Sequence, residues 1–181
     1  MYALITSVRG RDPNAAIYYL ARMLKAGEDP KCIARRLVIL ASEDIGLAKP
    51  NGLLLANACF DTVHKIGMPE ARIPLAEATI YLATSPKSNS AYMAINNAMQ
   101  FAMHDTNNRP VPLHIRNAPT KLMKELNYGK DYKYAHDFAG NFVEQEFMPA
   151  GLEGSRVYEP DDNPKETELS RRIAQLWKGK Y

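Results

Sequence analysis

The chain has 181 residues, of which 46% are hydrophobic and 24% are charged, and its formal net charge at pH 7 is +3. This balance is typical of a globular protein with one proper core and argues against extensive disorder. No apolar run approaches the roughly 20 residues that cross a membrane, and the first residues do not form a signal peptide. We therefore expect a cytoplasmic protein without a membrane partner. The weak positive charge permits a nucleic-acid partner but does not require one.

Prolines divide the first half of the chain at regular intervals and predict where helices begin. A proline fits the first turn of a helix, because its missing N–H would have no partner there. Asp12 and Asp29 precede two of these prolines and are expected to cap the helices that follow. A glycine lies upstream of each of the first four prolines, where the preceding helix should end in a left-handed turn. The prolines are Pro13, Pro30, Pro50, Pro69 and Pro86, and the glycines are Gly10, Gly27, Gly46 and Gly67.

The segments between the prolines repeat apolar residues at the spacing of one helix face, and no segment before residue 110 alternates as a strand would. Short connections require neighbouring helices to form antiparallel or crossed hairpins. We expect an all-α fold, a compact bundle of helical hairpins, and favour it over a repeat solenoid because the hairpins share only Pro and Gly. The expected buried faces are Ile17, Leu20, Ala21 and Leu24; Ile33, Leu37, Leu40 and Ala41; Leu55, Ala58, Cys59 and Val63; Ala76, Ile80 and Ala83; and Tyr92, Ile95, Met99 and Met103.

The second half of the chain has a different composition. We expect residues 107–181 to form an irregular segment that wraps the helical core 1–106, within a single domain overall. Dense prolines oppose a helix from 107 to about 118. A short helix is expected over 119–126, a helical turn near 144–147, and a final helix over 167–178 after a start signal at 161–164.

The chain carries no motif that indicates catalysis. It lacks the G-x-x-x-x-G-K-[ST] phosphate-binding loop, and its histidines have no Cys or His at metal-ligand spacing. We therefore expect no enzyme activity, cofactor or metal site in this chain. Cys32 and Cys59 lie in helical apolar patterns and are expected to be buried free thiols. The histidines are His64, His104, His114 and His136.

Glu43 and Asp44 stand near the expected end of a helix at Gly46, where the helix dipole disfavours anions. This mismatch indicates a specific cationic partner. We expect a structural ion pair with an arginine such as Arg9 or Arg35.

A basic and aromatic segment between Arg109 and Tyr134 is the strongest candidate binding site. Six basic residues outnumber two acidic ones, a local charge of +4, and tyrosines are interleaved with them. Such groups can neutralise phosphates and stack on unpaired bases. Alternatively, the tyrosines anchor a wrapping loop while the lysines are merely solvated, or the segment contacts another protein. The candidate residues are Arg109, Arg116, Lys121, Lys124, Lys130, Lys133, Tyr128, Tyr132 and Tyr134.

Residues 137–168 have the opposite charge, with nine acidic residues against two basic ones. This acidic segment could mask the basic one, within the chain or from a neighbouring subunit, which is compatible with head-to-tail assembly. A solvated acidic loop is the simpler interpretation.

Five motifs together resemble a known family. They are SVRGRDPNAAIYYLARML at 7–24, ARRLV…ASEDIGLA within 34–48, ATSPKSN at 83–89, VPLHIRNAPTKLMKEL at 111–126 and YGKDYKYAHD at 128–137. From about residue 4 to 160 the chain is similar to the C-terminal region of the replication-associated recombination protein A family, which includes the Werner helicase-interacting ATPases.

The resemblance implies a clamp-loader-like parent with an N-terminal AAA+ core, followed by a helical region through which the protein forms homotetramers. Such proteins act at damaged forks, in the nucleoid, on DNA ends and single-strand/duplex junctions. ATP and Mg²⁺ would belong to the core, which this chain lacks, so we expect a fragment that begins inside the first helix of the region. The roles implied are self-assembly, DNA binding through residues 109–134, or docking of a replication partner such as single-strand binding protein. Candidate assembly contacts, apolar residues outside the main stripes, are Tyr18, Tyr19, Leu53 and Phe60.

Overall fold

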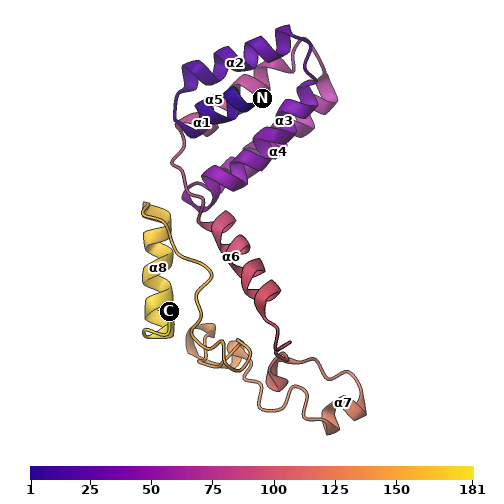
Figure 1. The fold of residues 1–181 in the computed structure, drawn as a ribbon, viewed down its shortest axis with the longest axis vertical. Coiled ribbons are helices and arrows are strands. Elements are labelled where there is room, and N and C mark those ends of the chain that lie inside the picture. The colour runs from indigo at the N-terminus through magenta and orange to yellow at the C-terminus, as the bar shows by residue number, and fades with distance from the viewer. The chain divides into compact units, whose positions relative to one another are not determined.

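The computed structural model describes residues 1–181 and contains helices but no strands, which confirms the all-α prediction (Figure 1). Short π- and 3₁₀-helical turns lie between the main helices, including a π-helical turn (Ala41–Ile45) that extends the third helix. No helix is both long and apolar enough to span a bilayer. The helices are α1 (Tyr2–Arg9), α2 (Pro13–Lys25), α3 (Pro30–Leu40), α4 (Asn51–Ile66), α5 (Arg72–Thr84), α6 (Ser90–His104), α7 (Lys121–Glu125) and α8 (Pro164–Trp177).

The chain forms two units, and helices α6 and α8 each begin in the first unit and end in the second. The change between units falls inside α6, and the predicted division of a single domain into 1–106 and 107–181 stays a prediction. Packing of residues 107–181 on the helical core stays a prediction. Unit 1 comprises Met1–Asn96 and Tyr158–Glu168, and unit 2 comprises Asn97–Val157 and Leu169–Tyr181.

Helices α2 and α3 begin as the sequence predicts. Each has its proline at the first position, and the preceding aspartate caps it: Asp12 Oδ1 accepts from the Ala15 N–H at 2.9 Å, and Asp29 Oδ1 accepts from the Lys31 N–H at 2.9 Å. These side chains satisfy amides that a helix start leaves without partners. Pro50 directly precedes α4.

The predicted starts after Pro69 and Pro86 are wrong. A turn closed by a 2.8 Å hydrogen bond from Ala71 N–H to the Gly67 carbonyl contains Pro69, and the proline in the first turn of α5 is Pro74. Pro86 lies in a non-helical connection, because the backbone at Ser88 bonds across the fold to Asp44 instead of forming a helical bond. Helix α6 starts only at Ser90.

The left-handed turn expected at Gly10 is also displaced. Gly10 has φ −75°, and its neighbour Arg11 takes the left-handed conformation with φ 63°. Gly46 at the third break has a positive φ of 47°, which favours glycine, but its ψ of −131° is not that of the predicted left-handed turn. A Cβ atom on Gly46 would lie 3.0 Å from the Ser88 carbonyl oxygen, so this close approach requires glycine.

Helix α5 is the centre of unit 1 and contacts α1, α2, α3 and α4, while Figure 1 shows α3 and α4 side by side. In a linear solenoid each repeat contacts only its neighbours, so the contacts of α5 with both α1 and α2 rule out that alternative. The predicted α5 face is partly right: Ala83 is fully buried and Ala76 packs against the core, but Ile80 is 45% exposed, and the fully buried Leu75 and Leu82 were not predicted. A helix that is apolar on all sides has no single stripe by which its buried face can be recognised.

The other predicted faces vary in accuracy. All four residues of the α3 face are buried, as predicted. On α2 and α4, Leu20, Cys59 and Val63 are buried, but Ala21 and Ala58 face solvent. In their place the core contains the small residues Ala16, Gly52 and Ala56, where helices approach closely.

Of the two free cysteines, only Cys59 is buried as predicted, and Cys32 is half-buried. The Cys59 thiol donates to the Pro74 carbonyl at 3.3 Å. Burial, together with the nearby Glu77 carboxylate, raises the pKa of Cys59 to about 11. A thiol in this state is a packing group with little reactivity at neutral pH.

The ion pair predicted for the acidic pair is confirmed. The Arg9 guanidinium donates through Nε to Asp44 Oδ1 at 2.8 Å and through Nη2 to Oδ2 at 3.1 Å, and Glu43 lies 3.6 Å away. This two-point geometry joins α1 to the π-helical turn. The alternative partner Arg35 instead lies near Cys32.

In the second half, two of the three predicted helices are present. Thr120 Oγ1 caps α7 by accepting from Met123 N–H at 3.2 Å, and α8 begins with Pro164 after the predicted start signal. The helical turn expected near 144–147 is wrong, since this stretch is not helical. Gln145 pairs its side chain with the Lys133 backbone at 2.9 Å, and a side-chain-to-backbone bond of this kind competes with helix formation.

Candidate functional site

One face of α6 carries large apolar side chains that are about half exposed or more. Tyr92, Ile95, Met99 and Met103 lie on one side of the helix and are 45%, 57%, 55% and 72% exposed. Their spacing in the sequence predicted an apolar stripe, but the prediction that it is buried is wrong. We call these four residues the α6 stripe.

Unit 2 has no buried side chain in its residues 97–157 or 169–181. Its nucleus is an aromatic cluster in which the Trp177 ring lies 5.2 Å from Phe142, 6.2 Å from Phe147 and 5.5 Å from Tyr181, between ring centres. Many other large apolar side chains face solvent, which is unusual for a unit that must be stabilised by apolar burial. These exposed residues are Phe101, Val111, Leu113, Leu122, Leu126 and Phe138.

The two arginines of the basic segment hold the local backbone in place. Arg109 forms an ion pair with Asp105, four residues earlier, and the two side chains are 25% and 17% exposed. Arg116 donates through Nε to the Val111 carbonyl at 2.6 Å, and its guanidinium carbon lies 5.0 Å from the centre of the Tyr128 ring. These arginines and Tyr128 are therefore already engaged within unit 2.

The lysines of the segment, by contrast, face solvent. The Lys121 side chain is 92% exposed, and its only ionic neighbour is Glu125 at 4.0 Å on the same short helix. Tyr132 and Tyr134 are about half exposed. These exposed side chains are accessible to a binding partner, and the role of all the predicted residues, the arginines included, stays a prediction. The exposed lysines are Lys121, Lys124, Lys130 and Lys133.

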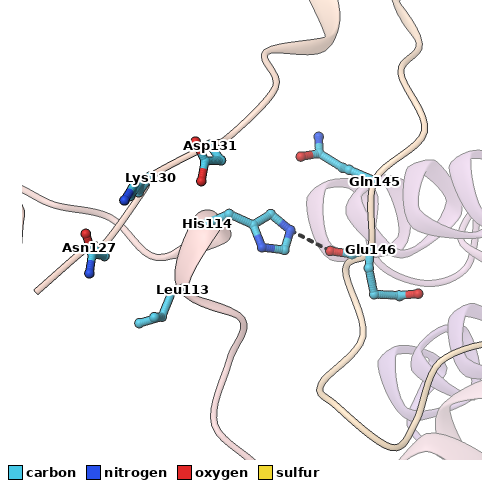
Figure 2. A pocket seen from close by; sticks show the side chains of 7 residues that line it. All are labelled: Leu113, His114, Asn127, Lys130, Asp131, Gln145 and Glu146. Atoms are coloured by element: carbon cyan, nitrogen blue, oxygen red, sulfur yellow. Dashed lines mark hydrogen bonds between the residues drawn. The ribbon is translucent and has the colours of Figure 1, made fainter.

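A hollow of about 470 Å³ has one of these lysines, Lys130, in its lining (Figure 2). The His114 ring points across it, and its Nε2 lies 2.6 Å from the Glu146 carbonyl oxygen, as the dashed line shows. Glu146 also binds Lys180 Nζ at 3.0 Å. Burial by itself raises the pKa of Glu146, but the Met148 N–H and Lys180 outweigh it and hold the pKa below its usual range.

The residues that line this hollow are of mixed chemical type. Its lining mixes one lysine with two acids and two amides, and no group of three or more His, Cys, Asp or Glu residues anywhere in the chain could hold a metal ion. The role of His114 could not be read from the sequence, where it stands alone. The lining residues are Leu113, His114, Asn127, Lys130, Asp131, Gln145 and Glu146.

Residues 10–177 match the family described as MgsA AAA+ ATPase C terminal. The chain belongs to this family. It is 42% identical to the replication-associated recombination protein A of Escherichia coli over 178 residues, which cover 96% of this chain and 39% of that protein. The corresponding protein of Coxiella burnetii is 44% identical over 172 residues, covering 94% and 39%. ATPase WRNIP1 of Dictyostelium discoideum is 42% identical over 158 residues, covering 87% and 18%.

The resemblance found in the sequence is thus confirmed, and the chain spans at most 39% of the length of these relatives. Three motifs of this MgsA-type C-terminal region meet in unit 1. Arg9 pairs with Asp44, whose carbonyl accepts from Ser88 N–H at 2.8 Å. Lys87 donates to the Leu82, Ala83 and Ser85 carbonyls at the end of α5.

Lys87 is the most perturbed cation of this cluster. Burial, with the nearby Arg11 charge, lowers its pKa to about 8, against the pull of Asp44 in the other direction. Its ammonium group closes the C-terminal end of α5, where free carbonyls favour a cation.

A carboxylate that the sequence analysis counted in the acidic segment is buried in unit 1. Glu166 is fully buried and accepts hydrogen bonds from Ser88 Oγ at 2.5 Å, Ser90 Oγ, Asn163 Nδ2 at 2.7 Å and Tyr158 Oη at 3.0 Å. The interpretation of a solvated acidic loop therefore fails at this residue. The N-x-x-E spacing of Asn163 and Glu166 is a helix-start signal that could have revealed it.

The assembly contacts suggested from the sequence lie in two environments. Tyr18 and Leu53 are 58% and 42% exposed, whereas Tyr19 and Phe60 pack against the core of unit 1. The Tyr18 ring lies 5.4 Å from Tyr19, and the Arg22 guanidinium lies 5.9 Å from the Tyr18 ring centre. Their role as assembly contacts stays a prediction.

Proposed function

We propose that this C-terminal region joins copies of its parent ATPase into a homo-oligomer, a homotetramer by the resemblance, through the α6 stripe and the apolar side chains of unit 2. The observation that carries the proposal is that residues 97–157 include no buried side chain, although large apolar residues are frequent there. Apolar surface of this extent on one protein is typical of an interaction site.

The energy available is of the right order. Full burial of a Met, Ile or Phe side chain contributes about 1.5–3 kcal/mol, and the stripe residues, already about half buried, would each contribute about half of that. Association costs at least about 4 kcal/mol in lost motion. The α6 stripe alone would barely offset this cost, so the other apolar side chains of unit 2 must take part.

A measurement of molar mass tests the proposal. Light scattering over a range of concentrations should give a mass near four times 20.3 kDa. The double variant Ile95→Glu with Met99→Lys should lower the mass, because it places charges on the stripe. The new pair, four residues apart, is itself favourable in a helix, so α6 should persist.

The matched control is Ile73→Lys with Ile80→Glu on α5, which are 55% and 45% exposed. It should retain the parental mass. The proposal would be refuted if the unsubstituted chain were monomeric at every concentration, or if the stripe variant kept the mass of the unsubstituted chain.

DNA binding is the second candidate function, favoured by the four exposed lysines and the exposed tyrosines of residues 109–134. A single-strand/duplex junction would be bound with an affinity that falls steeply with salt. In the double variant Lys121→Ala with Lys124→Ala, fluorescence anisotropy should show the salt slope reduced by roughly 0.7–0.9 for each phosphate that is no longer neutralised. The control Lys25→Ala with Lys31→Ala, exposed on unit 1, should leave the slope unchanged.

Docking of a replication protein uses the same basic surface. A partner such as single-strand binding protein would present an acidic tail to these lysines. Binding of an acidic peptide, measured with and without competing junction DNA, separates this role from DNA binding. A docking site should bind the peptide in the absence of DNA.

The activity of the parent lies outside these residues. The relatives' names and the family description support a role in replication-associated recombination. A location in the cytoplasm at the nucleoid is implied only by the resemblance of the motifs. ATP and Mg²⁺ would be bound by the AAA+ core of the parent, since no phosphate-binding loop occurs in this sequence.

A further inference from the structure

The Glu166 carboxylate is an unusual group, because it is fully buried without forming an ion pair. Its two oxygens receive four hydrogen bonds from the uncharged side chains of Ser88, Ser90, Asn163 and Tyr158. A buried charge is costly unless its hydrogen-bonding capacity is filled. All four donors suit a carboxylate, which only accepts, better than they suit a neutral amide.

The position of this carboxylate connects two helices at their first turns. Ser90 is the first residue of α6, and Glu166 is the third residue of α8. Asn163 closes the arrangement, since its side-chain oxygen accepts from the Glu166 N–H at 3.0 Å while its amide donates back to the carboxylate. The start of a helix carries a partial positive charge, so one anion stabilises both helix starts.

The charge persists at neutral pH. Burial alone raises the pKa of Glu166, but the hydrogen bonds from Ser88, Ser90 and Asn163 together outweigh it and hold the pKa below its usual range. Tyr158 responds in the opposite way, because burial and the neighbouring carboxylate raise its pKa to about 12.

We infer that Glu166 is a positioning residue: an anionic clasp that holds the first turns of α6 and α8 together and so orients the α6 stripe for self-association. The inference rests on the proposed assembly function. Both helices begin at the clasp and continue into unit 2; Tyr92 and Ile95 of the stripe lie in the part of α6 that belongs to unit 1, and Met99 and Met103 in the part that belongs to unit 2. Loss of the clasp should therefore weaken assembly while the core of α1–α5 stays folded, because the core contacts do not include the carboxylate.

The test compares Glu166→Gln with Glu168→Gln. Glu168 lies two residues further along α8, and its side chain is 75% exposed. Light scattering should show the dissociation constant of Glu166→Gln raised at least tenfold, and hydrogen exchange should become faster at the first turns of α6 and α8. Amides of α3 should keep their protection from exchange. The control Glu168→Gln should match the unsubstituted chain in both measurements.

A second variant tests the inference in case Glu166→Gln does not fold. Tyr158→Phe removes one of the four hydrogen bonds and keeps the charge, so it should show the same pattern to a smaller extent. Unchanged assembly in a folded Glu166→Gln protein would overturn the inference. So would loss of α3 protection in step with loss of assembly, because the role would then be general stability.

Failure of the proposed function is recognised separately. If the unsubstituted chain is monomeric, assembly through this surface is refuted. Hydrogen exchange alone then tests whether Glu166 holds the two helix starts together. Faster exchange confined to the two helix starts would support it, and unchanged exchange there would overturn it.

Discussion

The hydroxyl of Thr79 offers a sharp test of the packing in unit 1. Thr79 lies in α5, is fully buried, and its Oγ1 has no hydrogen-bond partner. A buried hydroxyl without a partner costs about 1–3 kcal/mol. Valine has nearly the same shape and a similar helix propensity. Thr79→Val should therefore raise the free energy of unfolding by about 1–2 kcal/mol.

Urea unfolding followed by circular dichroism measures this change as a higher midpoint with an unchanged slope. Thr84→Val is the matched control on the same helix, since Thr84 Oγ1 donates to the Ile80 carbonyl at 2.8 Å and is exposed. The control should be neutral or slightly destabilised. A lower midpoint for Thr79→Val would refute the reasoning, because it would mean that the hydroxyl makes a bond that stabilises α5.

Three further outcomes are expected. A double-mutant cycle of Arg9→Ala and Asp44→Asn should give a coupling of about 0.5–1 kcal/mol, since Arg9 is 46% exposed, and zero coupling would contradict the pair. Gly46→Ala should lower the urea midpoint by the equivalent of about 1–3 kcal/mol, because its φ is 47° and the new Cβ would meet the Ser88 carbonyl; an unchanged midpoint would contradict this strain. The lowered pKa of Glu166 means that its stabilisation is complete above its ordinary value of 4.5 and is lost as pH falls through the folded value. On acidification, the midpoint temperature of thermal unfolding should fall less for Glu166→Gln than for the unsubstituted chain. An equal fall would contradict this assignment.

Local features of the fold followed directly from the sequence. The caps of α2 and α3 depend on residues next to each other in the chain, so Asp12 and Asp29 could be assigned their partners in advance. The Arg9–Asp44 pair spans 35 residues, yet it was predictable because an acid at a helix end is unfavourable without a cation. The motifs were likewise sufficient to identify the family.

Burial was the feature that the sequence did not contain. Ile80 and Ile95 both stood in regular apolar patterns, yet both face solvent, because a pattern marks a face and not what covers it. Helix α5 carries apolar residues on its exposed face, such as Ile73 and Ile80, as well as on its buried face, so its sequence has no unique apolar face to detect. Nothing near Glu166 in the sequence indicates that it is fully buried, since its four hydrogen-bond partners come from positions 88 to 163.

The sequence by itself determined the helical class, the helix starts with local caps, the absence of a phosphate-binding loop and the family. Each depends on residue types at short spacing, where backbone geometry dictates the outcome. Only the tertiary structure decided which apolar residues form the core, which basic residues remain free, and that the α6 stripe is uncovered. These properties depend on contacts between residues far apart in the chain, because burial belongs to the assembled helices and not to any one of them.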